Sequence, residues 1–364
     1  MAEGTEPIKI TSSDLTSQRV EEFVAQQQAG RQGMAVGALP PPTPFWLSPI
    51  FYLGLAGALG ALSGWGIIEP FFDDGERTAG HLVAAMLFFP TIGGLIGLFI
   101  GAAEGIVSRN LAKGALGGVI GLGVGFAGGF LSAIVAGFVY GLIHIIGAIS
   151  GLINPHEVQR VGLRGTAFLL QVMARSMAWA AAGVTVGLGQ GIAMKSSKMV
   201  WTGLLGGTLG GAIGGLFFDP VNRILAGPML DKYVEPSRAI GVMCVGLMAG
   251  MFVGLVEHFA KEAWLLMAAG PLAGKQFVLY KNPTTLGSSP KCDVYLFKDP
   301  EIEPRHAQIH KVGVHYELED CGSAAGGYVN NIPIKRQRLQ DGDRIVLGKT
   351  VFQYSERAKE KAGA

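Results

Sequence analysis

The chain of 364 residues combines 49% hydrophobic residues with only 15% charged residues, and it contains 56 glycines. Ordinary soluble domains carry about 25% charged residues and about 7% glycine, so this composition excludes a single large soluble domain. The formal net charge of +2 gives no indication of a nucleic-acid partner. Three scattered cysteines predict neither a disulfide framework nor a zinc cluster.

Residues 1–44 are polar and predict a cytosolic tail that is partly disordered. Asp14 is able to cap a short helix that runs to Gln28, because its carboxylate can accept free backbone amides. Pro40–Pro44 then predicts a stiff linker. The charges among the first 31 residues do not fit a secretory signal peptide, so we expect the amino terminus to stay in the cytosol.

Charge-free runs between 45 and 270 predict an all-α transmembrane bundle, because an ionised side chain costs about 2.5–3.5 kcal/mol in hydrocarbon. The third run, 114–156, is too long for one crossing and has no polar turn. We expect a helix through Ile143 there, followed by an interfacial stretch. The six predicted spans are 47–68, 79–104, 114–140, 176–194, 199–218 and 239–258.

Lysine and arginine in the short loops predict that both termini are cytosolic. The compact glycine-rich spans favour the plasma or inner membrane of a prokaryote. The basic loop residues on the predicted cytosolic side are Arg109, Lys113, Lys195, Lys198 and Lys261. Arg160, Arg164 and Arg175 fall on the opposite side, where we expect an interfacial helix whose long side chains reach the headgroups.

Glycines recur at helical spacing in two segments, at 114, 118, 121 and 125 and again at 203, 207, 210 and 214. This internal repeat predicts helix-packing faces, since small residues let helices approach closely in a bilayer. The alternative is that these faces line a pore or a substrate path.

Three spans end in Gly-x3-Gly-x2-Glu or Gln, which brings Glu104, Gln190 and Glu257 to the predicted cytosolic ends. Ionisable groups at membrane depth are candidates for a cation or proton site. The simpler interpretation is that they lie at the interface and pair with Arg109, Lys195 or Lys261.

After Trp264 the hydropathy falls, and short segments rich in Val, Ile, Tyr and Phe alternate with turns. This pattern predicts an all-β sandwich over 271–355, followed by a disordered tail over 356–364. The predicted strands are Gln276–Tyr280, Val294–Phe297, Ala307–His310, His315–Glu319, Tyr328–Asn330, Arg344–Leu347 and Val351–Tyr354.

Several motifs of this region occur in a recognisable order. They are Leu286-Gly287, Cys292-Asp293-Val294, Arg305-His306-Ala307, the run from Asp320 to Asn330, and the run from Leu339 to Gly348. Over about 274–355 the chain resembles the forkhead-associated (FHA) domain, a phosphothreonine-reading β-sandwich. The resemblance implies ligand-binding loops at Gly287, Ser288, Ser289, Lys291, Glu303, Arg305, His306, Asn330 and Asn331.

The chain departs from the family at the phosphate contacts. Ser288 stands where the family has its phosphate-binding arginine, and Glu303 stands where it has a phosphate-contacting serine. The asparagine that holds the ligand backbone is kept as Asn330, but the following glycine is Asn331, while His306 remains. A lost guanidinium and an added carboxylate both weaken phosphate binding. We therefore expect a protein partner with weak or no phosphothreonine dependence.

Two alternatives stay open for the module. Lys281, Lys291 and Arg305 offer substitute charge for a phosphoprotein, or the edge binds nothing and the module serves folding or contacts in a homo-oligomer. No catalytic motif, metal site or cofactor site is recognised, so we expect a non-enzymatic protein. The first hypothesis is a membrane-anchored adaptor or signalling protein. The second is a channel or transporter regulated by its FHA-like module.

Overall fold

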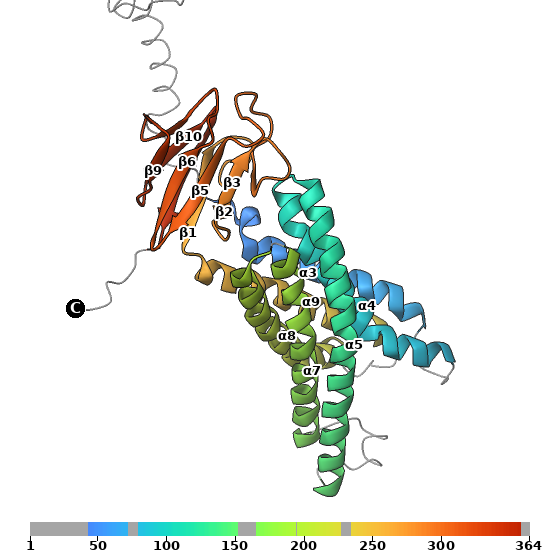
Figure 1. Ribbon diagram of the computed structural model, residues 1–364. Helices are drawn as coiled ribbons and strands as arrows, with labels where there is room; N and C mark the ends of the chain where they lie inside the picture. The colour runs from blue at the N-terminus through green and yellow to red at the C-terminus, as the bar shows by residue number, and fades with distance from the viewer. Residues whose placement is uncertain (1–42, 72–78, 152–164, 194, 227–233, 358–364) are drawn as a thin grey trace, which may run out of the picture. The chain divides into compact units, whose positions relative to one another are not determined.

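The computed structural model describes residues 43–71, 79–151, 165–193, 195–226 and 234–357. Long helices come first in this part of the chain and eleven strands follow (Figure 1). The predicted tail helix from Asp14 to Gln28 lies outside the described residues. The long helices are α3 (Pro49–Ile68), α4 (Ala79–Val107), α5 (Leu111–Ile149), α7 (Gly165–Ala193), α8 (Ser197–Ala226) and α9 (Val234–Ala260).

Six helices in the described ranges are long and apolar enough to cross a membrane, which matches the predicted number. Several predicted boundaries were wrong, among them the end of the fifth span, since α8 continues past 218 to Ala226. α5 does not end at Ile143 but continues to Ile149, giving 39 residues and about 58 Å of helix, because neither proline nor an Asp, Glu, Lys or Arg residue interrupts it after Lys113. α7 begins at Gly165 and not at 176, so it includes Arg175.

Arg175 does not lie in an interfacial helix before the fourth span, contrary to the prediction. Its Nε lies 3.2 Å from Oδ2 of Asp219 on α8, and this ion pair allows the helix to extend through the arginine. Arg160 and Arg164 lie outside the described residues.

The long helices pack in chain order around a closed ring, because α3 contacts both α4 and α9. α7 also contacts α4 and α9 across the ring. Ile96, Trp179 and Val245 fill the centre, where the remaining cavity measures about 10 Å³. A space of that size holds about one water molecule.

Glycines lie where the helix backbones meet. A Cβ on Gly101 of α4 would lie 2.2 Å from the carbonyl oxygen of Gly117 on α5. α7 and α8 use glycine in the same way, since a Cβ on Gly187 would lie 1.8 Å from the carbonyl oxygen of Gly203. These glycines therefore act in helix packing in the structure, where a methyl group would collide with backbone.

The strands form a sandwich of two sheets. One sheet has the order β2-β1-β11-β10-β7-β8 and the other has the order β4-β3-β5-β6-β9. Leu265, Leu318 and Phe352 are fully buried between them. The strands are β1 (Ala263–Ala269), β2 (Gln276–Val278), β3 (Thr284–Gly287), β4 (Val294–Tyr295), β5 (Ala307–Val312), β6 (His315–Asp320), β7 (Gly327–Val329), β8 (Ile332–Ile334), β9 (Arg336–Arg338), β10 (Arg344–Leu347) and β11 (Thr350–Glu356).

The sandwich begins at Ala263, earlier than the predicted boundary at 271. β1 pairs with both β2 and β11, so it belongs to the sheet and not to the bundle. Its sequence, Ala-Trp-Leu-Leu-Met-Ala-Ala, is uniformly apolar like the spans before it, and a short apolar run without alternation does not distinguish a strand from a helix. Residues 263–357, from the start of β1 to the end of the described chain, are called the head below.

Candidate binding site

The predicted ligand-binding positions from Gly287 to His306 meet at one edge of the head, whereas Asn330 and Asn331 follow the far end of β7 and contact the turn before β10. The amide of Ser288 donates to the carbonyl of Glu303 over 2.9 Å, which brings the end of β3 against the segment before β5. Gly287 has no room for a side chain at this crossing, because a Cβ would lie 2.3 Å from the carbonyl oxygen of Pro304. Positions 288 and 303 are therefore direct neighbours, as the resemblance implies.

The Glu303 carboxylate is already engaged with the protein. Its Oε1 accepts a hydrogen bond from the amide of Ala324 over 2.9 Å. The amide of Ala324, which could otherwise bind the anion of a ligand, is thus hydrogen-bonded to a carboxylate of the protein itself. A phosphate arriving here would meet like charge, which costs affinity.

The side chain of His306 is completely buried and joins the surrounding loops through hydrogen bonds. Its Nδ1 accepts from the amide of Glu303 over 3.3 Å, which assigns the ring proton to Nε2 in the neutral form. Nε2 lies 3.1 Å from Oγ of Ser323 and 3.4 Å from the carbonyl oxygen of Gly326. The histidine therefore positions two loops and does not contact solvent.

Asn330 and Asn331 turn the chain after β7 with φ angles of 51° and 68°. Asparagine tolerates this left-handed region better than most residues. Asn330 donates from Nδ2 to Asp343 over 2.8 Å and accepts at Oδ1 from the amide of Arg344 over 2.9 Å. Its side chain is thus occupied in holding the neighbouring turn, while both asparagines are exposed.

The three cations proposed as substitutes for the missing arginine are differently placed. Arg305 and Lys291 are exposed. Lys281 instead forms an ion pair with Asp293, with 2.6 Å between Nζ and Oδ1. Arg305 and Lys291 are therefore the cations that this edge offers to a ligand, and Lys281 is not.

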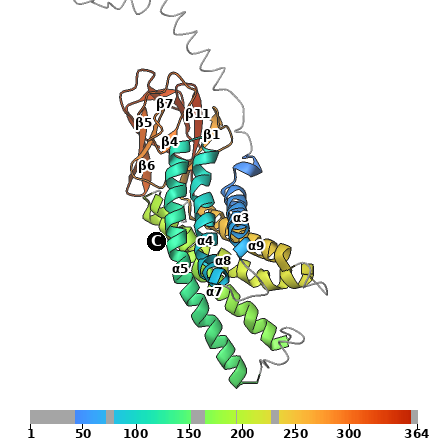
Figure 2. The same cartoon turned by 90° about the vertical axis from the view of Figure 1, so that its right-hand side faces the viewer.

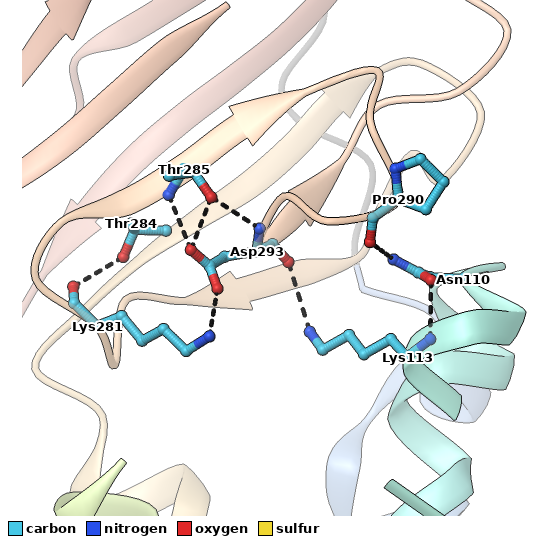
Figure 3. Close-up of polar contacts among 7 residues, drawn as sticks. All are labelled: Asn110, Lys113, Lys281, Thr284, Thr285, Pro290 and Asp293. Atoms are coloured by element: carbon cyan, nitrogen blue, oxygen red, sulfur yellow. Dashed lines mark hydrogen bonds and ion pairs between the residues drawn. The ribbon is translucent and has the colours of Figure 1, made fainter. Parts of the chain in front are cut away.

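The β3–β4 loop of the head contacts the start of α5 (Figure 3). Asn110 donates from Nδ2 to the carbonyl of Pro290 over 2.8 Å, and Lys113 reaches the carbonyl of Asp293 over 3.4 Å. Burial disfavours the charged Asp293, but hydrogen bonds from Lys281 and Thr285 outweigh it and lower the pKa of that carboxyl. Figure 2 shows α4 and α5 side by side below the sandwich at this contact.

A second contact joins the head to the bundle through Lys275, whose side chain is 2% exposed. Its Nζ lies 3.3 Å from the carboxylate of Glu104 on α4. Tyr52 of α3 donates to the same carboxylate over 2.7 Å. Glu104 therefore pairs with the head, and not with Arg109, Lys195 or Lys261 as the simpler interpretation expected.

Glu257 of α9 is also buried, at 7% exposure, and it faces the same space. The Oε2 atom of Glu257 and the hydroxyl of Tyr280 are neighbours. Neither atom forms a hydrogen bond of good geometry with any group among the described residues. Burial, followed by the charge of Glu257, raises the pKa of Tyr280. The structure thus brings Glu104 and Glu257 together, while the side chain of Gln190 lies outside the described residues.

Sequence reasoning missed Lys275, Tyr52 and Tyr280. Lys275 is 171 positions from Glu104, and a lone lysine in a turn carries no local signal of burial. Within the described ranges, no group of three or more His, Cys, Asp or Glu side chains could hold a metal ion. The arrangement is therefore suited to binding a protein surface at one edge and to fixing the head on the bundle at another.

Known proteins match the head. The sequence profile of the FHA domain matches residues 284–348. The chain is 37% identical over 99 residues to an oxoglutarate dehydrogenase inhibitor of Corynebacterium jeikeium, a match that covers 27% of this chain and 68% of the relative. It is 36% identical over 88 residues to the glycogen accumulation regulator GarA of Mycolicibacterium smegmatis, covering 24% of this chain and 55% of the relative.

A solved structure from work on phosphothreonine-dependent FHA domain interactions is 25% identical, with a TM-score of 0.25. It covers 27% of this chain and 100% of that structure. These matches concern about a quarter of the chain, and the chain spans about two thirds or less of the two curated relatives.

Proposed function

Because the chain belongs to the FHA-domain family through its carboxyl-terminal region, we propose that it is a membrane-anchored adaptor whose head recruits a protein partner at the cytosolic surface. The observation that carries the proposal is the pairing of an exposed recognition edge with a head that Lys275 and the β3–β4 loop hold on the helices. A head attached in this way presents its edge in one orientation.

Insertion into a membrane is supported by the six long apolar helices and by the large hydrophobic side chains on their outer faces. Leu131, Ile134 and Phe138 of α5 are 60–70% exposed, which would be costly in water. The basic loops near Arg109 and Lys195 support a cytosolic head under the positive-inside rule. Both termini are then cytosolic, and the protein is a multi-pass protein of a prokaryotic inner or plasma membrane.

The partner is a protein because the matched relatives are named as an inhibitor of an enzyme and as a regulator. Dependence on phosphothreonine is weak or absent here. Ser288 offers no guanidinium, and the Glu303 carboxylate occupies the amide of Ala324. The protein acts by binding and not by catalysis, and partner contact runs through the exposed Arg305, Asn330 and Asn331.

An anchor is favoured over a channel because Trp179 and its neighbours fill the centre of the helical ring. The cavity beside Trp179, at about 10 Å³, is too small for a water path at that level of the bundle. The buried end of the bundle near Glu104 is also occupied by Lys275 of the head.

The test uses full-length protein, tagged and purified in mild detergent from its own host, followed by identification of co-purified proteins. Arg305→Glu reverses an exposed charge on the recognition edge, and Arg338→Glu makes the same change on β9 as a matched control. We expect one partner to be retained by the wild type and by Arg338→Glu, and lost from Arg305→Glu. Equal retention by both variants would contradict recruitment through this edge.

A further inference from the structure

A cavity of about 340 Å³ lies between the head and the bundle, beside the contact shown in Figure 3. The last turns of α4, the first turns of α5, Lys195 between α7 and α8, and the β3–β4 loop all contribute to its wall. Its cations are Lys113, Lys195, Lys281 and Lys291. Two of these lysines come from the helical part and two from the head.

The carboxylates of the cavity do not balance these lysines. Glu104 is paired with Lys275, and Asp293 is paired with Lys281. Lys113 reaches only a main-chain carbonyl, that of Asp293. Lys195 and Lys291 have no ion pair within the described part of the chain, and both are exposed. Two ammonium groups, those of Lys195 and Lys291, therefore line the cavity without an ion-pair partner among the described residues.

The backbone adds to this positive field. Ala112, in the first turn of α5, lines the cavity, so the amino-terminal end of a 39-residue helix faces it. The first amides of a helix attract negative charge. The two unpaired lysines, Lys195 and Lys291, supply the independent charge that makes the place suited to an anion.

An apolar track leaves the same cavity along α5. Leu116 lines the cavity and is 58% exposed, and Val119 on the next turn is 66% exposed. Gly123 has open space beside it, and Phe126 follows at 39% exposure. Residues at this spacing share one helix face, so a strip of apolar surface begins directly at the basic cavity.

We propose that this cavity binds the headgroup phosphate of an anionic phospholipid, with one acyl chain lying along Leu116, Val119 and Phe126. The proposal rests on membrane insertion as given under the proposed function. A soluble phosphate ester would satisfy the lysines but would leave the apolar strip uncovered. A bound headgroup joins Lys291 of the head to Lys113 and Lys195 of the helices, so the lipid also holds the head in place.

The test measures lipid binding to the detergent-purified full-length protein by native mass spectrometry, with phosphatidylglycerol and phosphatidylcholine as probes. Lys195→Gln combined with Lys291→Gln removes two unpaired cations. Lys298→Gln combined with Lys335→Gln removes two exposed lysines elsewhere on the head as a matched control. We expect the first double variant to bind phosphatidylglycerol about tenfold more weakly and the control to bind it like the wild type.

Inorganic phosphate and glycerol phosphate, added separately, distinguish the two sources of the anion. We expect neither to displace phosphatidylglycerol at millimolar concentration. Displacement by either would overturn the lipid assignment in favour of a soluble phosphate, and equal lipid binding by both double variants would overturn the site itself. Carbonate extraction of membranes tests insertion separately, so a protein that stays in the membrane but lacks the lipid preference refutes only this inference.

Discussion

The bundle and the head are built on opposite uses of side chains. In the bundle, backbones touch at glycines such as Gly101 and Gly117, and a single methyl group would collide there. In the head, β1 buries alternate side chains, and Leu265 and Phe352 fill the space between two sheets. The bundle therefore depends on the absence of side chains at its helix contacts, whereas the head depends on large side chains that fill its core.

The largest expected effect comes from adding a side chain to a helix contact. Gly187→Leu would force carbon atoms into the carbonyl of Gly203, so we expect no folded, monodisperse protein in size-exclusion chromatography. Gly137→Leu is the matched control, since nothing lies within 4 Å of a Cβ at that position. A normal elution profile for Gly187→Leu would show that the close backbone approach is not required.

The next effect concerns the place where the two regions meet. Lys275→Met would leave the partly buried carboxylate of Glu104 with the Tyr52 hydroxyl but without a cation, at a cost of about 3 kcal/mol of unfolding free energy. Adding Glu104→Gln removes the unpaired charge, so the double variant should be more stable than Lys275→Met alone. Thermal unfolding in detergent measures both, and additive losses would argue against the pair.

The third prediction tests whether the edge of the head has lost phosphate binding through the residues at 288 and 303. Ser288→Arg with Glu303→Ser supplies a guanidinium and frees the amide of Ala324. We expect affinity for a phosphothreonine peptide to rise at least about tenfold over wild type, measured by calorimetry. The unphosphorylated peptide is the control, and an equal gain for both peptides would exclude phosphate recognition.

The smallest effect is the pH dependence of Glu262, which follows α9. Hydrogen bonds from Lys198 of α8 and Lys311 of β5 lower its pKa from 4.5 to about 2. The ionised carboxylate therefore stabilises the fold above pH 4.5, and this contribution disappears as the pH falls toward 2. Because the side chain is 46% exposed, the gain is at most about 1 kcal/mol.

We expect Glu262→Gln to lower the Tm by about 2 °C at pH 6, with the difference from wild type shrinking as the pH approaches 3. Glu301→Gln is the control, because its partner Lys349 lies 3.9 Å away and its side chain is 49% exposed. A difference that stayed constant with pH would mean that the ion pairs of Glu262 do not contribute.

Local patterns in the sequence were enough for most of the fold. The charge-free runs indicated all six long helices, and β10 was predicted with its observed bounds, Arg344–Leu347. β1 was missed because its seven residues are all apolar, and a short apolar run without alternation does not distinguish a strand from a helix. The matched profile over 284–348 confirms the FHA resemblance, while the ligand-binding role of its loops stays a prediction.

The contacts between the regions could not be predicted, because they join positions far apart in the chain. Asn110 and Pro290 are 180 positions apart, and Lys275 and Glu104 are 171 apart. Nothing in the local sequence around Lys275 or Glu104 indicates that the two side chains pair. The engagement of Glu303 with Ala324 likewise depends on how two loops fold together.

The contact between α3 and α9 has a consequence for biosynthesis. A Cβ on Gly57 would lie 2.0 Å from the carbonyl oxygen of Gly246, so α3 has its tightest glycine partner in α9. A ribosome makes α3 first and releases α9 only after the other described helices. The ring therefore closes late in translation, shortly before the head that follows α9 emerges to fold.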